Sequence, residues 1–77
     1  MANVKTVESI IKKADEMFDI FYVTVYNLHG NAAPKGSDFE TTEDAIAAYG
    51  DEEVCEWKIE SAYGDKVNVT VKLKHVF

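Results

Sequence analysis

Cysteine, proline and tryptophan each occur only once in this chain of 77 residues. A single cysteine, Cys55, cannot form a disulfide within the chain, and it excludes a zinc site built from four cysteines. Apolar runs are also short, and none approaches the roughly 20 residues that a membrane-spanning helix needs. No secretion signal is recognisable at the start of the chain. We therefore expect a protein of the cytoplasm that does not bind membranes.

Basic residues are also scarce, with 8 Lys and Arg against 14 Asp and Glu and a formal net charge of −6. Such an acidic balance disfavours docking on nucleic acid or on anionic lipid. The chain is long enough for only one domain, which we expect to span residues 1–77. Its hydrophobic fraction of 47% is sufficient for a packed core. Because small domains have little stability to spare, self-association is the expected reinforcement.

The first half of the chain contains two different hydrophobic periodicities. Apolar residues at helical spacing predict an amphipathic surface helix, with one stripe made of Val7, Ile10, Ile11, Ala14, Met17 and Phe18. Residues 20–28 are the longest run of β-branched and aromatic residues, which predicts a strand. Side chains alternate between the two faces of a strand, so the core face would carry Phe21, Val23 and Val25.

The second half predicts a loop over residues 29–38, a helix from about Thr41 to Gly50, and two strands over 54–63 and 67–77. The two strands form a hairpin, whose loop can contain three residues (62–64) or two (64–65). The three-residue loop is favoured because it places Ile59 opposite Val67 and keeps both apolar faces together. A two-residue loop would need a bulge.

The predicted fold class is α+β, with the order helix, strand, helix, strand, strand. We expect a three-stranded, mainly antiparallel sheet with both helices packed on one face. The last strand is placed in the middle, antiparallel to both neighbours, and the first strand at an edge. In an alternative arrangement the first two strands are adjacent and parallel, joined by a right-handed crossover.

The sequence contains only weak matches to catalytic, phosphate-binding and metal-binding motifs. The 29–38 loop resembles a phosphate-binding loop only superficially, because Lys35 precedes Gly36 and the motif needs the reverse order. Cys55 and His75 share the inward side of their strands, but a lone strand cysteine is most often a small buried hydrophobe. His29, Cys55 and His75 lack the paired spacing of metal ligands. The sequence predicts no cofactor, no metal and no catalysis. An enzyme that acts through Cys55 is the third and least favoured of the functions considered.

The outer sheet face, turned away from the helices, is the best candidate binding surface. Seven residues are predicted to lie there: Tyr22, Thr24, Tyr26, Val54, Lys58, Thr70 and Lys72. Tyrosine is enriched at protein interfaces and contributes a large rigid contact area. In an alternative, purely structural interpretation, these tyrosines have no binding role and only pack against the aliphatic stems of lysine and threonine on neighbouring strands.

The predicted function is a small non-catalytic protein-binding or regulatory module. It would dock a partner protein, or a second copy of itself, through the outer sheet face or an edge strand. The alternative is a single-stranded nucleic-acid binder that stacks bases on the tyrosines beside lysines. Glu56 and Glu60 on the same face, together with the overall acidity, make nucleic acid the less favoured partner.

Overall fold

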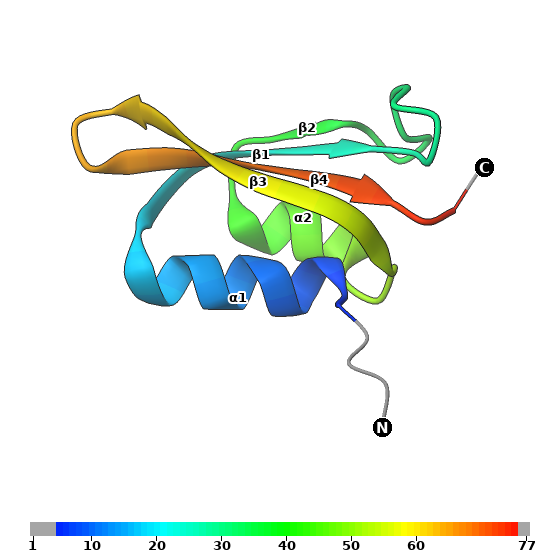
Figure 1. Ribbon diagram of the computed structural model, residues 1–77, viewed down its shortest axis with the longest axis horizontal. Coiled ribbons are helices and arrows are strands. Elements are labelled where there is room, and N and C mark those ends of the chain that lie inside the picture. Colours follow the sequence, from blue (N-terminus) through cyan, green and yellow to red (C-terminus); the bar gives the residue numbers. More distant parts are fainter. Residues whose placement is uncertain (1–4, 76–77) are drawn as a thin grey trace.

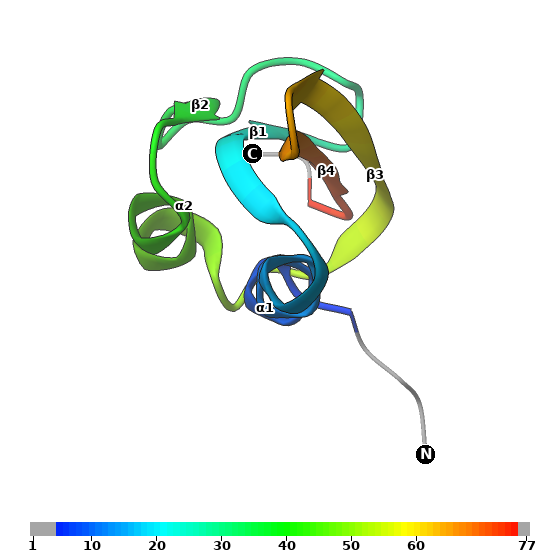
Figure 2. The ribbon, with the colours of Figure 1, turned by 90° about the vertical axis from the view of Figure 1, so that its left-hand side faces the viewer.

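The computed structural model describes residues 5–75, which form two helices and one four-stranded sheet. The elements in chain order are α1 (Val7–Met17), β1 (Asp19–Tyr26), β2 (Asp38–Phe39), α2 (Thr42–Tyr49), β3 (Val54–Tyr63) and β4 (Lys66–Leu73). Figure 1 shows both helices on the same side of the sheet, and Figure 2 shows the two layers from one end. The predicted α+β class and the placement of both helices on one face are confirmed.

Local capping explains where the helices begin. The Thr6 hydroxyl accepts a hydrogen bond from the Ser9 N–H at 3.2 Å, and the Ser9 hydroxyl accepts one from the Thr6 N–H at 2.9 Å. This reciprocal box satisfies two backbone donors at the start of α1. At α2 the Thr41 hydroxyl accepts from the Asp44 N–H at 3.1 Å. Both helices therefore begin where a threonine side chain replaces the missing backbone partner.

The core lies between the helices and the inner face of the sheet. Every second residue of β4 is buried, from Val67 to Leu73, and Val23 and Val25 of β1 are completely buried beside them. α1 contributes a buried stripe that ends at Ala14, while α2 contributes Ala45 and Tyr49. The inward-facing residues of the strands and the apolar stripe of α1 thus pack together in one apolar layer.

The sheet differs from the prediction in strand number and in direction. Its order is β2-β1-β4-β3, so β4 lies in the interior as predicted, but β4 runs parallel to β1 and not antiparallel. The additional strand, β2, pairs antiparallel with β1 through Val23 opposite Phe39. The predictions of three strands and of β1 as an edge were therefore wrong. β2 has only two residues, too few to show an alternating pattern in the sequence. Phe39 is held in place by an edge-on contact with Tyr49, with 6.0 Å between the ring centroids.

The hairpin between β3 and β4 uses the two-residue loop. Tyr63 pairs with Lys66, and Ile59 lies opposite Val69, not opposite Val67 as predicted. A bulge between Ser61 and Tyr63 absorbs the change of face that had counted against this loop. Gly64 has a φ of +57°, a conformation that other residues rarely adopt, so the turn is formed where glycine permits it.

Two more bulges move side chains to the opposite face from the one predicted. One lies between Ile20 and Tyr22 in β1, and one between Val54 and Glu56 in β3. Phe21, predicted for the core, is consequently 44% exposed, whereas Val54, predicted for the outer face, is only 6% exposed. The extra residue of a bulge shifts the inward–outward alternation of side chains by one position. Counting odd and even positions along the sequence therefore assigns the wrong face beside a bulge.

β4 ends at Leu73, and residues 76–77, to which the strand was predicted to extend, lie outside the described range. Neither helix between residues 5 and 75 combines the length and the apolar character needed to cross a membrane.

Candidate functional site

The outer face of the sheet brings most of the predicted binding residues together. Cross-strand pairing sets them in three rows over β1, β4 and β3: Tyr22–Asn68–Glu60, Thr24–Thr70–Lys58 and Tyr26–Lys72–Glu56. Six of the seven candidates occupy these rows, and Val54 is the exception because it is buried. Tyr26, Lys58, Thr70 and Lys72 also line one shallow hollow of about 570 Å³, together with Cys55, Glu56 and Trp57.

Lysines on the outer face lie beside carboxylates. Lys72 Nζ is 3.7 Å from Glu56, and Lys58 Nζ is 3.2 Å from Glu60. At one end of the face, Lys66 Nζ donates to Asp19 Oδ2 at 2.6 Å, and this bond raises the pKa of Lys66. Positive charge on this face is therefore compensated within the chain, which weakens it as a surface for phosphate groups.

An aromatic cluster occupies the end of the outer face near the hairpin turn. The Phe21 ring meets Tyr63 edge-on, with 5.0 Å between centroids, and lies 6.3 Å from Tyr22. Desolvation raises the pKa of Tyr22, and the charges of Asp38 and Glu40 add to the shift. Tyr22 is thus half-buried, and its ring lies beside Phe21.

Cys55 and His75 do not share a site. The bulge leaves Cys55 exposed and not buried as expected, with its thiol donating weakly to the Leu73 carbonyl at 3.7 Å. His75 lines a different hollow, together with Lys74 and the acidic turn 51–53. Within residues 5–75, no group of three His, Cys, Asp or Glu side chains is placed to hold a metal ion.

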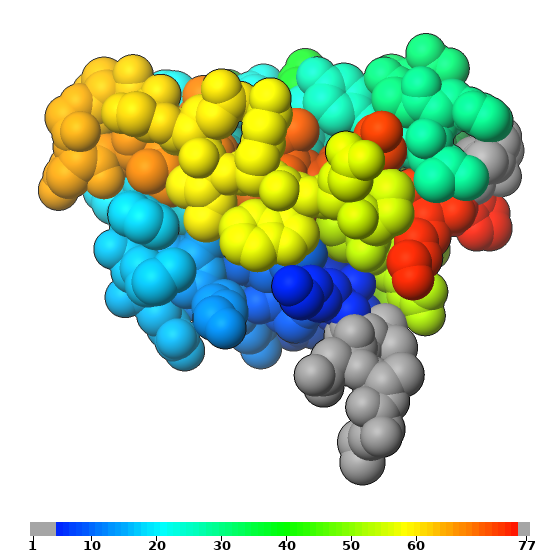
Figure 3. Space-filling view, in the orientation of Figure 1, coloured from blue at the N-terminus to red at the C-terminus, as the bar shows by residue number. Residues whose placement is uncertain are grey.

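A second surface, which the sequence did not indicate, lies between α1 and β3. We call it the α1/β3 groove, about 370 Å³ in volume; it is lined by Lys5, Ser9, Ile10, Lys13, Ala14, Met17, Trp57 and Ile59. In Figure 3 the side chains of β3 (yellow) lie above α1 (blue) along this boundary. Met17 is 62% exposed and Trp57 is 44% exposed, although Met17 was expected in the apolar stripe of the first helix.

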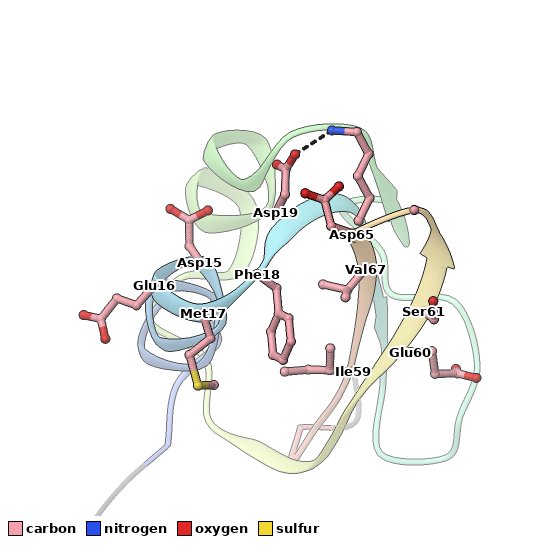
Figure 4. Close-up of a pocket in the computed structure, with 12 residues that line it drawn as sticks. Asp15, Glu16, Met17, Phe18, Asp19, Ile59, Glu60, Ser61, Asp65 and Val67 are labelled. Carbon is pink, nitrogen blue, oxygen red and sulfur yellow. Dashed lines mark hydrogen bonds and ion pairs between the residues drawn. The ribbon is translucent and has the colours of Figure 1, made fainter.

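The groove continues at Met17 and Ile59 into a wider depression beside the hairpin. This hairpin hollow has a volume of about 810 Å³ and an apolar floor made by Met17, Phe18, Ile59 and Val67. Figure 4 shows Phe18 directed toward Ile59, with Met17 and Val67 on either side. Phe18, 41% exposed, was expected in the core stripe but follows the last helical residue, in extended conformation.

Charges are segregated along these two depressions. Lys5 and Lys13 line the end near Trp57, and the Lys5 ammonium lies over the Trp57 ring, 5.6 Å from its centroid. Asp15 and Glu16 line the other end, near the hairpin, and point outward from α1 in Figure 4. The surface therefore has an apolar centre, one basic end and one acidic end.

The β3 strand beside the groove is an edge of the sheet, because β4 is its sole strand partner within residues 5–75. Among the described residues, only those at its beginning are covered on the other side: the Val54 N–H donates to the Lys5 carbonyl at 2.8 Å, and Thr6 forms an isolated bridge with Glu53. From Glu56 to Ser61 the pairing with β4 is regular. Backbone groups of this run that point away from β4 are available to an added strand.

Comparisons of the chain with models of protein families, with curated proteins and with solved structures found no match. The function is therefore inferred from the geometry of these surfaces.

Proposed function

We propose that this chain is a non-catalytic, cytoplasmic protein-binding module that takes up an extended segment of another polypeptide along the free edge of β3. Backbone hydrogen bonds from β3 would supply affinity, and alternate side chains of the bound segment would enter the α1/β3 groove and the hairpin hollow. This is strand addition, in which main-chain pairing holds the peptide and pockets beside the edge select its sequence.

The observation that carries the proposal is the coincidence of an open strand edge with an apolar groove. Free strand edges are normally protected by charges pointing inward, by proline or by cover. Along the regular run of β3, the side chains on the helix side are Trp57, Ile59 and Ser61, and the first two are apolar and border the groove. Exposed Met17 and Phe18 continue the same apolar surface.

The outer face is the weaker candidate. Its lysines are paired with carboxylates, and Tyr22 is half-buried against Phe21. A stacking platform for single-stranded nucleic acid needs open aromatic faces and unpaired positive charge. The groove, by contrast, offers both exposed apolar area and an unpaired backbone edge.

Selection from a random peptide library tests this assignment. The chain would be immobilised sparsely, so that its edge stays accessible, and recovered peptides would be titrated into isotopically labelled protein. We expect amide shift changes concentrated in 56–61 and in α1, and alternating apolar residues in the recovered sequences. Met17→Asp should weaken binding at least about tenfold, because it places a charge in the apolar groove.

Tyr26→Ala, on the outer face, is the matched control and should leave peptide binding unchanged. The proposal is refuted if Met17→Asp binds the selected peptides as well as the parent chain does. Oligonucleotide binding that weakens steeply with salt and is lost in Tyr22→Ala with Tyr26→Ala would instead support the nucleic-acid alternative.

A further inference from the structure

The charges on the outer side of β3 alternate in sign along the free edge. Glu56, Lys58 and Glu60 follow one another on this side, opposite Lys72, Thr70 and Asn68 of β4. The side chains of Lys58 and Glu60 are both more than half exposed and are not fixed by the core. Such a pattern can be complementary to itself when a second, identical strand runs antiparallel beside it.

Twofold symmetry leaves four registers for two β3 strands within this run. Centring the axis on Lys58 opposes Lys58 to Lys58 and Glu56 to Glu60 twice, so every charge faces a like charge. Centring it on Trp57 opposes Glu56 to Lys58 twice, but extends the pairing into the bulge at Cys55 and the covered backbone of Val54. The first register is repulsive, and the second is obstructed. A third, centred on Glu60, is both, because Glu60 faces Glu60 and the pairing runs past Ser61 into the bulge.

A twofold axis centred on Ile59 avoids both the like-charge pairs and the bulged or covered parts of the strand. Lys58 then faces Glu60 of the second copy, and the symmetric pair repeats the same attraction. The residues from Trp57 to Ser61 that come into contact all belong to the regular part of the strand. Directly opposed opposite charges stabilise an antiparallel pair, whereas like charges destabilise it.

The same register places an aromatic anchor beside a hollow. On the helix side it brings each Trp57 opposite Ser61 of the second copy, and Ser61 lines the hairpin hollow together with Phe18 and Met17. An indole ring removes a large apolar area from water, and buried tryptophans in pockets dominate many interfaces. The hollow of one copy would therefore receive the exposed tryptophan of the other.

The helices add a second complementarity. The groove contacts show that the Lys5 end of α1 lies near Trp57, and the hollow contacts place Asp15 and Glu16 near Ser61. Antiparallel strands would set the two α1 helices antiparallel as well. The basic end of each groove then approaches the acidic end of the other, which favours this encounter over a parallel one.

From these relations we infer that the extended segment bound by β3 is the β3 strand of a second copy of this chain. The two copies form a twofold dimer centred on Ile59, with one continuous eight-stranded sheet and all four helices on one side. The inference depends on the proposed function, since it names the occupant of the same edge and groove.

Charge reversal at Lys58 and Glu60 tests both the dimer and its register. Lys58→Glu and Glu60→Lys should each weaken self-association at least about tenfold, because two attractive pairs become repulsive. The double variant restores opposite charges in the register centred on Ile59 and should associate like the parent. A mixture of the two single variants should form a heterodimer. Sedimentation equilibrium over a wide concentration range provides the masses, and emission from the single tryptophan should shift to the blue as the dimer forms.

Circular dichroism of each variant establishes that these exposed substitutions leave the fold intact. A parent chain that remains monomeric at every concentration overturns the inference, as does a dimer that neither charge reversal weakens. A dimer that the double variant fails to restore also overturns it, because the register would then be wrong. None of these results would affect peptide selection, which tests the proposed function separately.

Discussion

Tyr49→Phe should remove one of the links between the 29–38 loop and α2 without unfolding the domain, while the Lys35 ammonium still donates to the Ala48 carbonyl at 3.3 Å. Tyr49 is 1% exposed, and its phenol oxygen accepts a hydrogen bond from the Lys35 backbone N–H at 2.5 Å. The ring itself packs edge-on against Phe39 and under the Lys35 ammonium, 6.0 Å from the centroid. The phenol therefore links a loop residue to the last residue of α2, and phenylalanine keeps the packing but not the link.

The expected loss of unfolding free energy is about 1–2 kcal/mol, because a partly buried N–H loses its partner while the ring volume is retained. A domain of this length has roughly 4–12 kcal/mol of stability, so the variant remains folded. Tyr49→Ala would also create a cavity and should cost about 3–5 kcal/mol. Denaturant titration measures these losses, and hydrogen exchange at the Lys35 amide reports the released bond directly.

Tyr63→Phe is the matched control, because Tyr63 is exposed on the outer face and should change stability by less than about 0.5 kcal/mol. Equal effects of Tyr49→Phe and Tyr63→Phe, or unchanged exchange at Lys35, would refute the role assigned to the phenol.

The same phenol predicts a loss of stability at alkaline pH. Burial raises the pKa of Tyr49, the Lys35 N–H lowers it in part, and the charge of Glu52 raises it again. Since the folded pKa lies above the unfolded value of about 10, this contribution is complete below that pH and is lost as pH rises through the folded pKa. Tyr49→Phe should lack this part of the alkaline loss, which unfolding curves taken on both sides of the transition would reveal.

Three further substitutions test individual features. Thr6→Ala removes the cap of α1 and should lower the unfolding free energy by about 1 kcal/mol in denaturant titration. Gly64→Ala places a side chain at positive φ and should cost about 1–2 kcal/mol in the same assay, whereas a smaller loss would contradict the two-residue turn. Asp19→Asn should return the Lys66 pKa toward its ordinary value in an NMR titration; the pair stabilises the fold below the ordinary lysine pKa and ceases to do so as pH rises through the raised one.

Much of the fold could be predicted because local signals and tertiary packing agree. Thr41 begins the second helix where it was predicted to, and Val67 lies on the buried side of β4 as expected. The direction of β1 relative to β4 has no local signal, since it depends on how the whole chain crosses the sheet. β2 is too short to predict from periodicity and depends on the packing of Phe39.

The candidate site was predicted less well, for a specific physical reason. Parity arguments assume unbroken strands, and bulges beside Phe21 and Val54 reverse the faces of those two residues. Helical spacing likewise placed Met17 and Phe18 in the core stripe, although the helix ends at Met17 and both side chains reach the surface. An apolar residue at the last turn of a helix can serve the core or a partner, and spacing alone does not distinguish these roles.

The parallel pairing of β1 with β4 has a consequence for folding during synthesis. Asp19 bonds to Lys66, 47 positions later, so β1 leaves the ribosome long before the strand that must lie beside it. Until then the valines of β1 have no neighbour on that side. Closing so large a loop costs chain entropy, which slows folding. A fragment that ends before β4 should therefore bind chaperones, whereas the chain that includes β4 should not.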